Sequence, residues 1–324
     1  MNREINRRDF LKLSFHTGGS ILASQILGSR TVRGAEKKCL KMNVGYLPIS
    51  DHLILPVSHA LDNETYRHVK VKPYLCKSWD ELSGKVDMGI LQAVFMLAPL
   101  AMFKMTTGSP LRCVLLGHTN GSVIAAEKSI ASANGLVGKT IGIPHAYATH
   151  RVLLYQYLKS RQVEKTDDIR LIKIPPPETV ENLKIKRIDA YTVAEPWGVR
   201  GVQEGIAHIL EYSGNIIPHH ACCLVMVKKN IIEKHPAAVS EWVQSLQTAG
   251  EAIHQNPDQA GRIQKAYMDH DPVDIARIVK DDIISYKALK PARDKLSIIH
   301  DLALECGVLW QTCDLDEFVV SRFA

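Results

Sequence analysis

Short apolar runs alternate along the chain with stretches in which apolar residues recur at helical spacing, from residue 40 onward. Short apolar runs predict buried strands, and the three-to-four-residue spacing predicts amphipathic helices. After residue 228 the pattern becomes almost wholly helical. Alternation of this kind is typical of βα units, so the pattern predicts an α/β fold with a mostly parallel sheet.

The runs that predict strands are rich in branched apolar side chains. They cover residues 41–47, 69–75, 88–92, 111–116, 122–126, 140–143, 169–174, 190–193 and 222–227. Helical patterns cover residues 52–61, 93–105, 149–161 and a stretch that begins at Pro177. Another helix is predicted to follow Pro236, with one apolar face made by Val239, Trp242, Val243, Leu246, Ala249 and Ile253.

The first 35 residues form a segment of different character. Arg7 and Arg8 are followed by Phe-Leu-Lys at 10–12, a weakly apolar stretch at 13–27 and small residues at 34–35. The apolar stretch is too short to span a bilayer. This order resembles a twin-arginine export signal, so we expect residues 1–35 to be a signal peptide and the mature protein to be soluble and periplasmic.

Composition narrows the class of protein. The chain has 324 residues, 46% hydrophobic and 23% charged, which is enough for two domains. Its net charge of +6 falls to +2 without residues 1–35, and no basic block remains, so we expect no nucleic-acid partner. Seven cysteines without a CxxC pair indicate neither a disulfide scaffold nor a compact zinc motif.

Several spaced segments together resemble one protein family. They are Val44-Gly45-Tyr46-Leu47-Pro48 with Asp51-His52, the stretch 79–87 before Met88-Gly89-Ile90, Pro99-Leu100-Ala101, Gly108-Ser109-Pro110-Leu111, the stretch 136–144, Ile188-Asp189-Ala190 leading to Glu195-Pro196-Trp197-Gly198, and Asn256-Pro257-Asp258-Gln259-Ala260. Their order over residues 40–290 resembles the periplasmic solute-binding proteins of the nitrate/sulfonate/bicarbonate ABC-transporter family, which has riboflavin and thiamine-pyrimidine relatives.

The resemblance implies a type II periplasmic-binding-protein fold: two hinged α/β lobes, with the chain crossing between them twice. Residues 36–125 and 222–324 would form the first lobe, and residues 126–221 the second. A small ligand would bind in the cleft between the lobes. The family implies a monomer that delivers this ligand to a membrane ABC permease and catalyses nothing.

In the second lobe, two turns offer candidate ligand contacts. Thr149 and His150 open a helix whose free N–H groups would attract an anion, as in the family's anion binders; otherwise Thr149 caps the helix and His150 is solvated. Glu195 and Trp197 flank Pro196, and either contact the ligand or serve as helix cap and packing residue. A carboxylate in the site disfavours binding of a bare anion unless a cation neutralises its charge.

In the first lobe, the candidates follow predicted strands. Ser50 comes after the first strand and Gln92 ends the predicted strand at 88–92, and carboxyl ends of strands form the usual ligand edge of an open α/β sheet. The alternative role for Asp51 is to cap the helix predicted to begin at His52. Ser50, Gln92, Thr149, His150, Glu195 and Trp197 are thus the predicted ligand contacts.

Histidines gather near these turns, but their spacing matches no compact metal motif. They are His52, His145, His150, His219 and His220. If several converged with Glu195 they would suit a transition metal, yet we expect neither a metal nor a cofactor. Cys222 and Cys223 lie in an apolar run and are expected to be buried as small apolar residues.

The predicted function is extracytoplasmic capture of a small polar ligand for an ABC importer. An anion of the nitrate, sulfonate or bicarbonate type, a zwitterion and a pyrimidine-like heterocycle all remain open. The alternatives are an enzyme on the same fold, similar to menaquinone-pathway dehydratases or the thiamine-pyrimidine synthase, and a sensor subunit that docks on a membrane receptor. The export signal opposes the enzymes, whose substrates are cytoplasmic.

Overall fold

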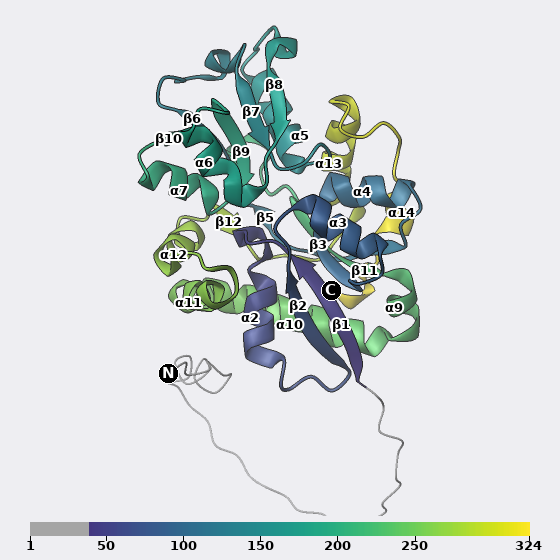
Figure 1. The fold of residues 1–324 in the computed structure, drawn as a ribbon. Helices are drawn as coiled ribbons and strands as arrows, with labels where there is room; N and C mark the ends of the chain where they lie inside the picture. The colour runs from purple at the N-terminus through teal and green to yellow at the C-terminus, as the bar shows by residue number, and fades with distance from the viewer. Residues whose placement is uncertain (1–38) are drawn as a thin grey trace, which may run out of the picture.

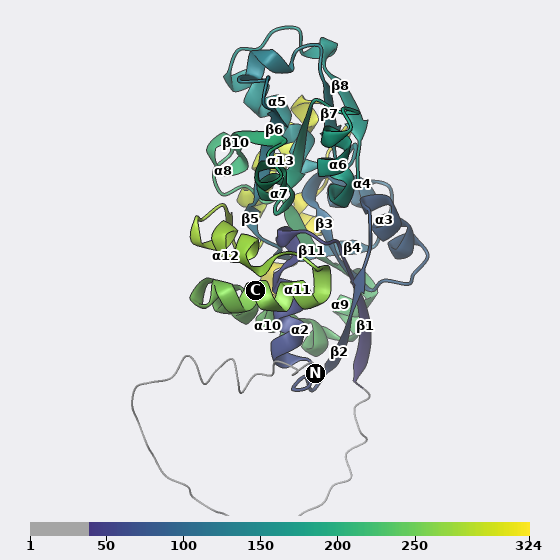
Figure 2. The same ribbon diagram turned by 60° about the vertical axis from the view of Figure 1, so that its left-hand side comes forward.

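Two five-stranded sheets lie in separate halves of an elongated molecule (Figures 1 and 2). The computed structural model describes residues 39–324; the predicted export signal lies outside the described residues. No helix within the described part of the chain is long and apolar enough to cross a membrane. The predicted α/β fold is confirmed.

The first sheet has the strand order β2-β1-β3-β11-β4. β1 pairs in parallel with β2 and β3, whereas β11 is antiparallel to both β3 and β4. β3, β4 and β11 are buried along almost their whole length, as their continuous apolar runs predict. The strands are β1 (Leu40–Tyr46), β2 (Val69–Leu75), β3 (Ala93–Leu97), β4 (Leu111–Leu116) and β11 (Cys223–Lys228).

The second sheet has the strand order β10-β6-β9-β7-β8. β7 is parallel to β8 and β9, and β6 is antiparallel to β9 and β10. The strands are β6 (Ser122–Glu127), β7 (Thr140–Ile143), β8 (Arg170–Lys173), β9 (Ala190–Ala194) and β10 (Ala207–Tyr212).

The chain passes between the sheets twice, after β4 and after β10. We call residues 40–118 and 222–324 the first lobe and residues 122–212 the second lobe. The predicted boundary at 125/126 is wrong by a few residues, because it would divide β6, which pairs entirely within the second sheet. A small ribbon of β5 (Thr119–Asn120) and β12 (Ile284–Ser285) lies at the first crossing.

Helices surround both sheets (Figure 1). In the first lobe they are α2 (Ile54–Asp62), α3 (Trp79–Asp87), α4 (Ala98–Thr106), α9 (Lys229–Lys234), α10 (Pro236–Gln255), α11 (Pro257–Met268), α12 (Pro272–Lys280), α13 (Arg293–Glu305) and α14 (Leu315–Phe318). In the second lobe they are α5 (Thr149–Ser160), α6 (Thr179–Lys184) and α7 (Trp197–Gln203), and α8 (Ser213–Ile216) follows. The apolar face predicted for the helix after Pro236 is buried in α10, as expected.

One strand was predicted in the wrong place. Residues 88–92 form a turn after α3: Gly89 has a φ of +77° and Met88 is 68% exposed. The strand β3 begins at Ala93, where a helix was predicted, and α4 follows only from Ala98. Two consecutive apolar stretches carry no period that separates a buried strand from a buried helix. The edge strand β10 was missed, because most of its side chains are only partly buried.

Candidate ligand-binding site

Three polar residues of the first lobe are brought together by strand direction. β1 and β4 end at the same edge of the sheet at which the antiparallel β11 begins. Asp51 follows β1 in the short 3-10 helix Ser50–His52, His118 follows β4, and Cys222 precedes β11. His118 Nε2 lies 3.0 Å from Asp51 Oδ2, and both side chains are fully buried.

The second lobe presents a matching edge. β7 and β9 end where the antiparallel β6 begins. His150 in the first turn of α5, Glu195 after β9 and Ser122 at the start of β6 therefore gather on this side. Ser122 Oγ lies 3.1 Å from His150 Nε2. All three residues are buried.

The two edges are in contact with each other. Thr149 Oγ1 donates to the carbonyl oxygen of Cys222 at 3.1 Å, and the Ser50 N–H donates to the carbonyl oxygen of Glu195 at 2.7 Å. Ser122 Oγ is also 3.8 Å from Cys222 Sγ. The two lobes are therefore closed on one another in this structure, with the polar groups of both edges shut between them.

Many of these buried polar atoms have no hydrogen-bond partner within the described residues. They are Ser50 Oγ, Asp51 Oδ1, His118 Nδ1, His150 Nδ1, Thr192 Oγ1, Glu195 Oε1 and His220 Nε2. Each unpaired buried polar atom costs about 1–3 kcal/mol, and native proteins keep few of them. Their concentration where the lobes meet indicates a place where a ligand supplies the missing partners.

Asp51 and His118, at the centre of the site, shift each other's pKa. Burial raises the pKa of the Asp51 carboxyl above its ordinary value, with the His118 imidazole opposing the rise. Burial disfavours the imidazolium of His118, but the Asp51 carboxylate and the Cys222 sulfur together outweigh this effect and raise the pKa of His118 to about 10. The imidazolium of His118 is therefore stabilised beside the Asp51 carboxylate.

The adjacent thiols differ in acidity. Burial opposes ionisation of Cys222, yet the Cys223 thiol and the imidazoles of His150 and His118 together hold the pKa of Cys222 well below its ordinary value. Burial and the neighbouring Cys222 raise the pKa of Cys223 well above it. Both cysteines are buried and free, as predicted, but their sulfur atoms face polar groups, so they are not simply small apolar residues.

Glu195 uses one carboxylate oxygen as a helix cap and leaves the other without a partner. Its Oε2 accepts a hydrogen bond from the Val199 N–H at 3.0 Å, which stabilises the start of α7, while Oε1 has no partner. A Cβ at Gly198 would lie 2.9 Å from Oε1, so the close approach of α7 requires glycine there. The side chain is fully buried, and this burial raises the pKa of the carboxyl to about 7.

Trp197 joins the lobes. Its Nε1 donates to the carbonyl oxygen of Pro48 at 3.2 Å, and its ring packs edge-on against His270 with the centroids 5.3 Å apart. His270 Nε2 contacts the same Pro48 oxygen at 2.9 Å. The indole N–H is therefore already used between the lobes.

Gln92 is not near this site. Its side-chain oxygen accepts from the Asn43 N–H at 2.9 Å, and its amide nitrogen donates to Gly89 O at 3.1 Å. It precedes β3 instead of following a strand, which places it at the opposite edge of the first sheet. The prediction that Gln92 lies at a strand's carboxyl end is wrong, because the strand was placed five residues too early.

Only some of the predicted histidines reach the site, among them His150, whereas His118, which was not singled out, lies at its centre. His145 lies 3.6 Å from Asp80, and His219 is exposed. His52 Nδ1 accepts from the Leu47 N–H at 2.8 Å. His118 was missed although it follows the predicted strand 111–116 by two residues, a position that the rule used for Ser50 would have selected.

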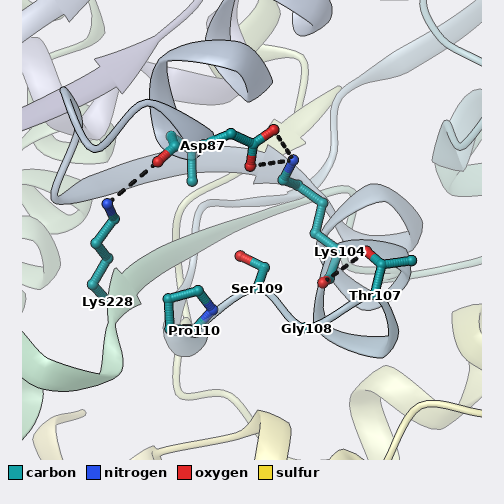
Figure 3. A pocket seen from close by; sticks show the side chains of 8 residues that line it. Asp87, Lys104, Thr107, Gly108, Ser109, Pro110 and Lys228 are labelled. Atoms are coloured by element: carbon teal, nitrogen blue, oxygen red, sulfur yellow. Dashed lines mark hydrogen bonds and ion pairs between the residues drawn. The ribbon is translucent and has the colours of Figure 1, made fainter.

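A pocket of about 450 Å³ is lined by residues from the opposite edge of the first sheet, away from both facing edges. Figure 3 shows the side chains that line it. Its lining includes Lys104, Lys228 and Ser109. Lys104 is paired with Asp87 at 2.9 Å, and Lys228 donates to the carbonyl oxygen of Val86 at 3.3 Å. Both lysine ammonium groups therefore already have partners. This pocket offers a ligand fewer unpaired polar groups than the interface between the lobes does.

Solved structures share this fold. The ligand-binding component of an ABC-type import system from Staphylococcus aureus, determined with zinc bound, superposes with a TM-score of 0.81 at 24% identity, covering 88% of this chain and 97% of that one. The periplasmic nitrate-binding protein NrtA from Synechocystis PCC 6803 gives a TM-score of 0.80 at 15% identity, covering 88% and 87%. At these identities the likeness shows the fold, and it confirms the predicted periplasmic-binding-protein architecture.

Proteins related in sequence include components of nitrate transport systems. The nitrate/nitrite binding protein NrtA of Nostoc sp. is 21% identical over 290 residues, which cover 75% of this chain and 65% of the relative. The nitrate import ATP-binding protein NrtC of Synechocystis sp. is 24% identical over 250 residues, covering 70% of this chain but only 37% of that protein. The chain thus spans less than two thirds of these relatives. The sequence model of the NMT1-like family matches residues 34–267, and the chain belongs to that family.

Proposed function

We propose that this protein is the extracytoplasmic solute-binding component of an ABC importer, which captures a small polar ligand between its two lobes and delivers it to a membrane permease. One observation carries the proposal: unpaired buried polar atoms from both lobes face the same interface, among them Asp51 Oδ1, His118 Nδ1, His150 Nδ1 and Glu195 Oε1. A ligand that satisfies them on both sides binds the closed state better than the open one.

Contacts around these atoms support a closed state that is stabilised by hydrogen bonds between the lobes. Thr149 and Trp197 of the second lobe donate to backbone carbonyl oxygens of Cys222 and Pro48. Away from the centre, Lys173 pairs with Asp80 at 2.7 Å. These contacts can form only when the lobes meet, so opening would release them together and give the ligand access.

The proposed ligand contacts are Ser50, Thr149, His150, Glu195 and Asp51 with His118. Solved structures that share the fold include a nitrate-binding protein, an alkanesulfonate-binding protein and a ligand-binding component determined with zinc bound, so the fold alone leaves the ligand class open. The buried carboxyl groups of Asp51 and Glu195 disfavour a bare anion, because they would place like charges together in a poorly solvated site. A zwitterion, a hydrogen-bonding heterocycle or an anion with a compensating cation satisfies both kinds of group.

We also propose that the ligand leaves unchanged. The relatives that resemble this chain over most of its length include binding proteins, whereas the desulfurization enzyme DSZB shares only the fold, at 13% identity and a TM-score of 0.64. Mass spectrometry of a ligand recovered after prolonged incubation tests this part. Recovery of a converted product would favour the enzyme class instead.

A thermal-shift screen with nitrate, bicarbonate, an alkanesulfonate, an aminopyrimidine and taurine tests the binding function. At least one should raise the melting temperature in a concentration-dependent manner. His150→Ala should reduce that shift, because it removes a partner from the ligand, while His235→Ala, on the exposed N-terminal side of α10, should not. No stabilisation by any small polar solute would contradict the proposal.

The export route has its own test. Because twin-arginine recognition depends on the paired arginines, replacing both Arg7 and Arg8 by lysine should leave the uncleaved chain in the cytoplasm. Cell fractionation and immunoblotting measure this directly. Normal export of the variant would contradict the proposed signal.

A further inference from the structure

We propose that Asp51, His118, Cys222 and Cys223 form a binding site for a divalent transition metal of the Zn²⁺ type at the base of the site between the lobes. One ligand atom from each of the four side chains lies within 4.8 Å of all the others, and all four residues are buried. Two thiols, an imidazole and a carboxylate are the ligand types that zinc prefers in proteins.

The distances are close to those that a tetrahedral ion requires. Bond lengths of about 2.0–2.3 Å place the ligand atoms of a tetrahedral zinc site about 3.3–3.8 Å apart. His118 Nε2 and Asp51 Oδ2 are 3.0 Å apart, and Cys223 Sγ and Asp51 Oδ2 are 3.5 Å apart. Small side-chain rotations are therefore sufficient to coordinate an ion.

Unpaired atoms supply an independent indication of a missing partner. Asp51 Oδ1 and His118 Nδ1 lack a hydrogen bond, although the two side chains are completely buried. A carboxylate and an imidazole left in this state are costly, and a coordinated cation removes the cost. The sites of these unpaired atoms coincide with the four-residue cluster.

Ser122 and Gly121, which lie next to the proposed ligands, are also compatible with a metal site. Ser122 Oγ lies 3.8 Å from Cys222 Sγ and can donate to it, the type of outer contact that orients a metal-bound sulfur. Gly121, with a φ of +87°, keeps space beside His118: a Cβ there would lie 3.1 Å from His118 Nδ1. The backbone at the first crossing is thus shaped closely around the imidazole.

The location gives the ion a role in ligand capture, an inference that rests on the proposed function. His118 and Cys222 lie at the two crossings between the lobes, so one ion would tie both crossings to Asp51. Its charge would also offset the carboxylates of Asp51 and Glu195, which otherwise oppose an anion. With the ion bound, an anionic ligand becomes compatible with this interface.

Titration of the chelator-treated full chain with Zn²⁺ under reducing conditions tests the proposal. We expect one tightly bound Zn²⁺ per chain, no comparable binding of Mg²⁺, and at least tenfold weaker Zn²⁺ binding in both Cys222→Ser and His118→Gln. Cys76→Ser, which changes a buried thiol outside the cluster, should bind like the wild type. Substoichiometric binding, or wild-type affinity in either cluster variant, would overturn the proposal.

Cobalt provides a readout that folding defects do not imitate. Co²⁺ bound to the wild-type chain should show the thiolate-to-metal absorption band, and Cys222→Ser should weaken it while circular dichroism stays native. If Cys222→Ser does not fold, Asp51→Asn serves as the second variant, and unchanged Zn²⁺ affinity in it would overturn the ligand set. A chelator-treated chain that binds nitrate or bicarbonate as tightly as the Zn²⁺-loaded chain would refute the metal's role and leave the proposed function standing.

Discussion

The indole Nε1 of Trp197 donates to the carbonyl oxygen of Pro48 at 3.2 Å, so a helix of the second lobe is hydrogen-bonded to the loop that leads from β1 to Asp51 in the first lobe. The contact exists only while the lobes are closed. Because Pro48 O also contacts His270 Nε2 at 2.9 Å, removing the indole donor would not leave that oxygen unpaired.

Trp197→Phe should therefore shift the lobes toward the open state without unfolding the protein. Loss of one net hydrogen bond of about 1 kcal/mol changes the closed-to-open ratio about fivefold. Small-angle scattering of the ligand-free variant should give a larger radius of gyration than the wild type. Trp79→Phe, which changes a tryptophan buried within the first lobe, is the control and should scatter like the wild type. Equal radii for Trp197→Phe and wild type would show that the contact does not contribute to closure.

Glu195 should make the stability of the fold pH-dependent. Burial raises its pKa from 4.5 to about 7, so the folded chain holds a proton that the unfolded chain has released. Stability should fall as the pH rises from 4.5 through 7, by up to about 3 kcal/mol for this group.

Glu195→Gln tests this linkage, since the amide cannot ionise but can still accept from the Val199 N–H. Urea unfolding at pH 5 and pH 8 should show a smaller loss of stability in the variant than in the wild type. Glu233→Gln, at an exposed position of α9, should keep the wild-type difference. Identical pH dependence in Glu195→Gln and wild type would rule out Glu195 as the titrating group.

Gly121 should be more sensitive to substitution than another glycine with positive φ. At Gly121 a Cβ would lie 2.7 Å from Ile284 Cδ1 and 3.1 Å from His118 Nδ1, whereas at Gly138, with a φ of +75°, nothing lies within 4 Å. Gly138→Ala should cost about 1 kcal/mol from backbone strain alone, and Gly121→Ala about 2 kcal/mol or more. Urea midpoints at constant slope measure both, and equal costs would contradict the packing account.

Periodicity and strand ends predicted the part of the fold that depends on local pattern. The apolar face of α10 and the turn positions of Ser50, His150 and Glu195 follow from the sequence and are found in the structure. The position of β3 could not be predicted, because residues 93–105 are apolar and have no periodicity that distinguishes a buried strand from a buried helix.

The rest of the site depends on strand direction, which local pattern does not encode. Ser122 and Cys222 stand at the beginnings of β6 and β11, and they reach the site only because these strands run antiparallel to their neighbours. A rule based on the carboxyl ends of parallel strands therefore misses them. The contact of His118 with Asp51 likewise joins positions 67 residues apart in the chain, whose proximity is set by the sheet order.

The central claim is that a small solute is bound between the two lobes and holds them closed. Its most direct test is small-angle X-ray scattering of the wild-type chain, with and without saturating amounts of each screened compound that raises its melting temperature. The account predicts a smaller radius of gyration in the presence of such a compound, and no decrease for the same compound with the His150→Ala variant. An unchanged radius in the wild type with every compound that binds would contradict it, because the ligand would then occupy a site that does not require closure.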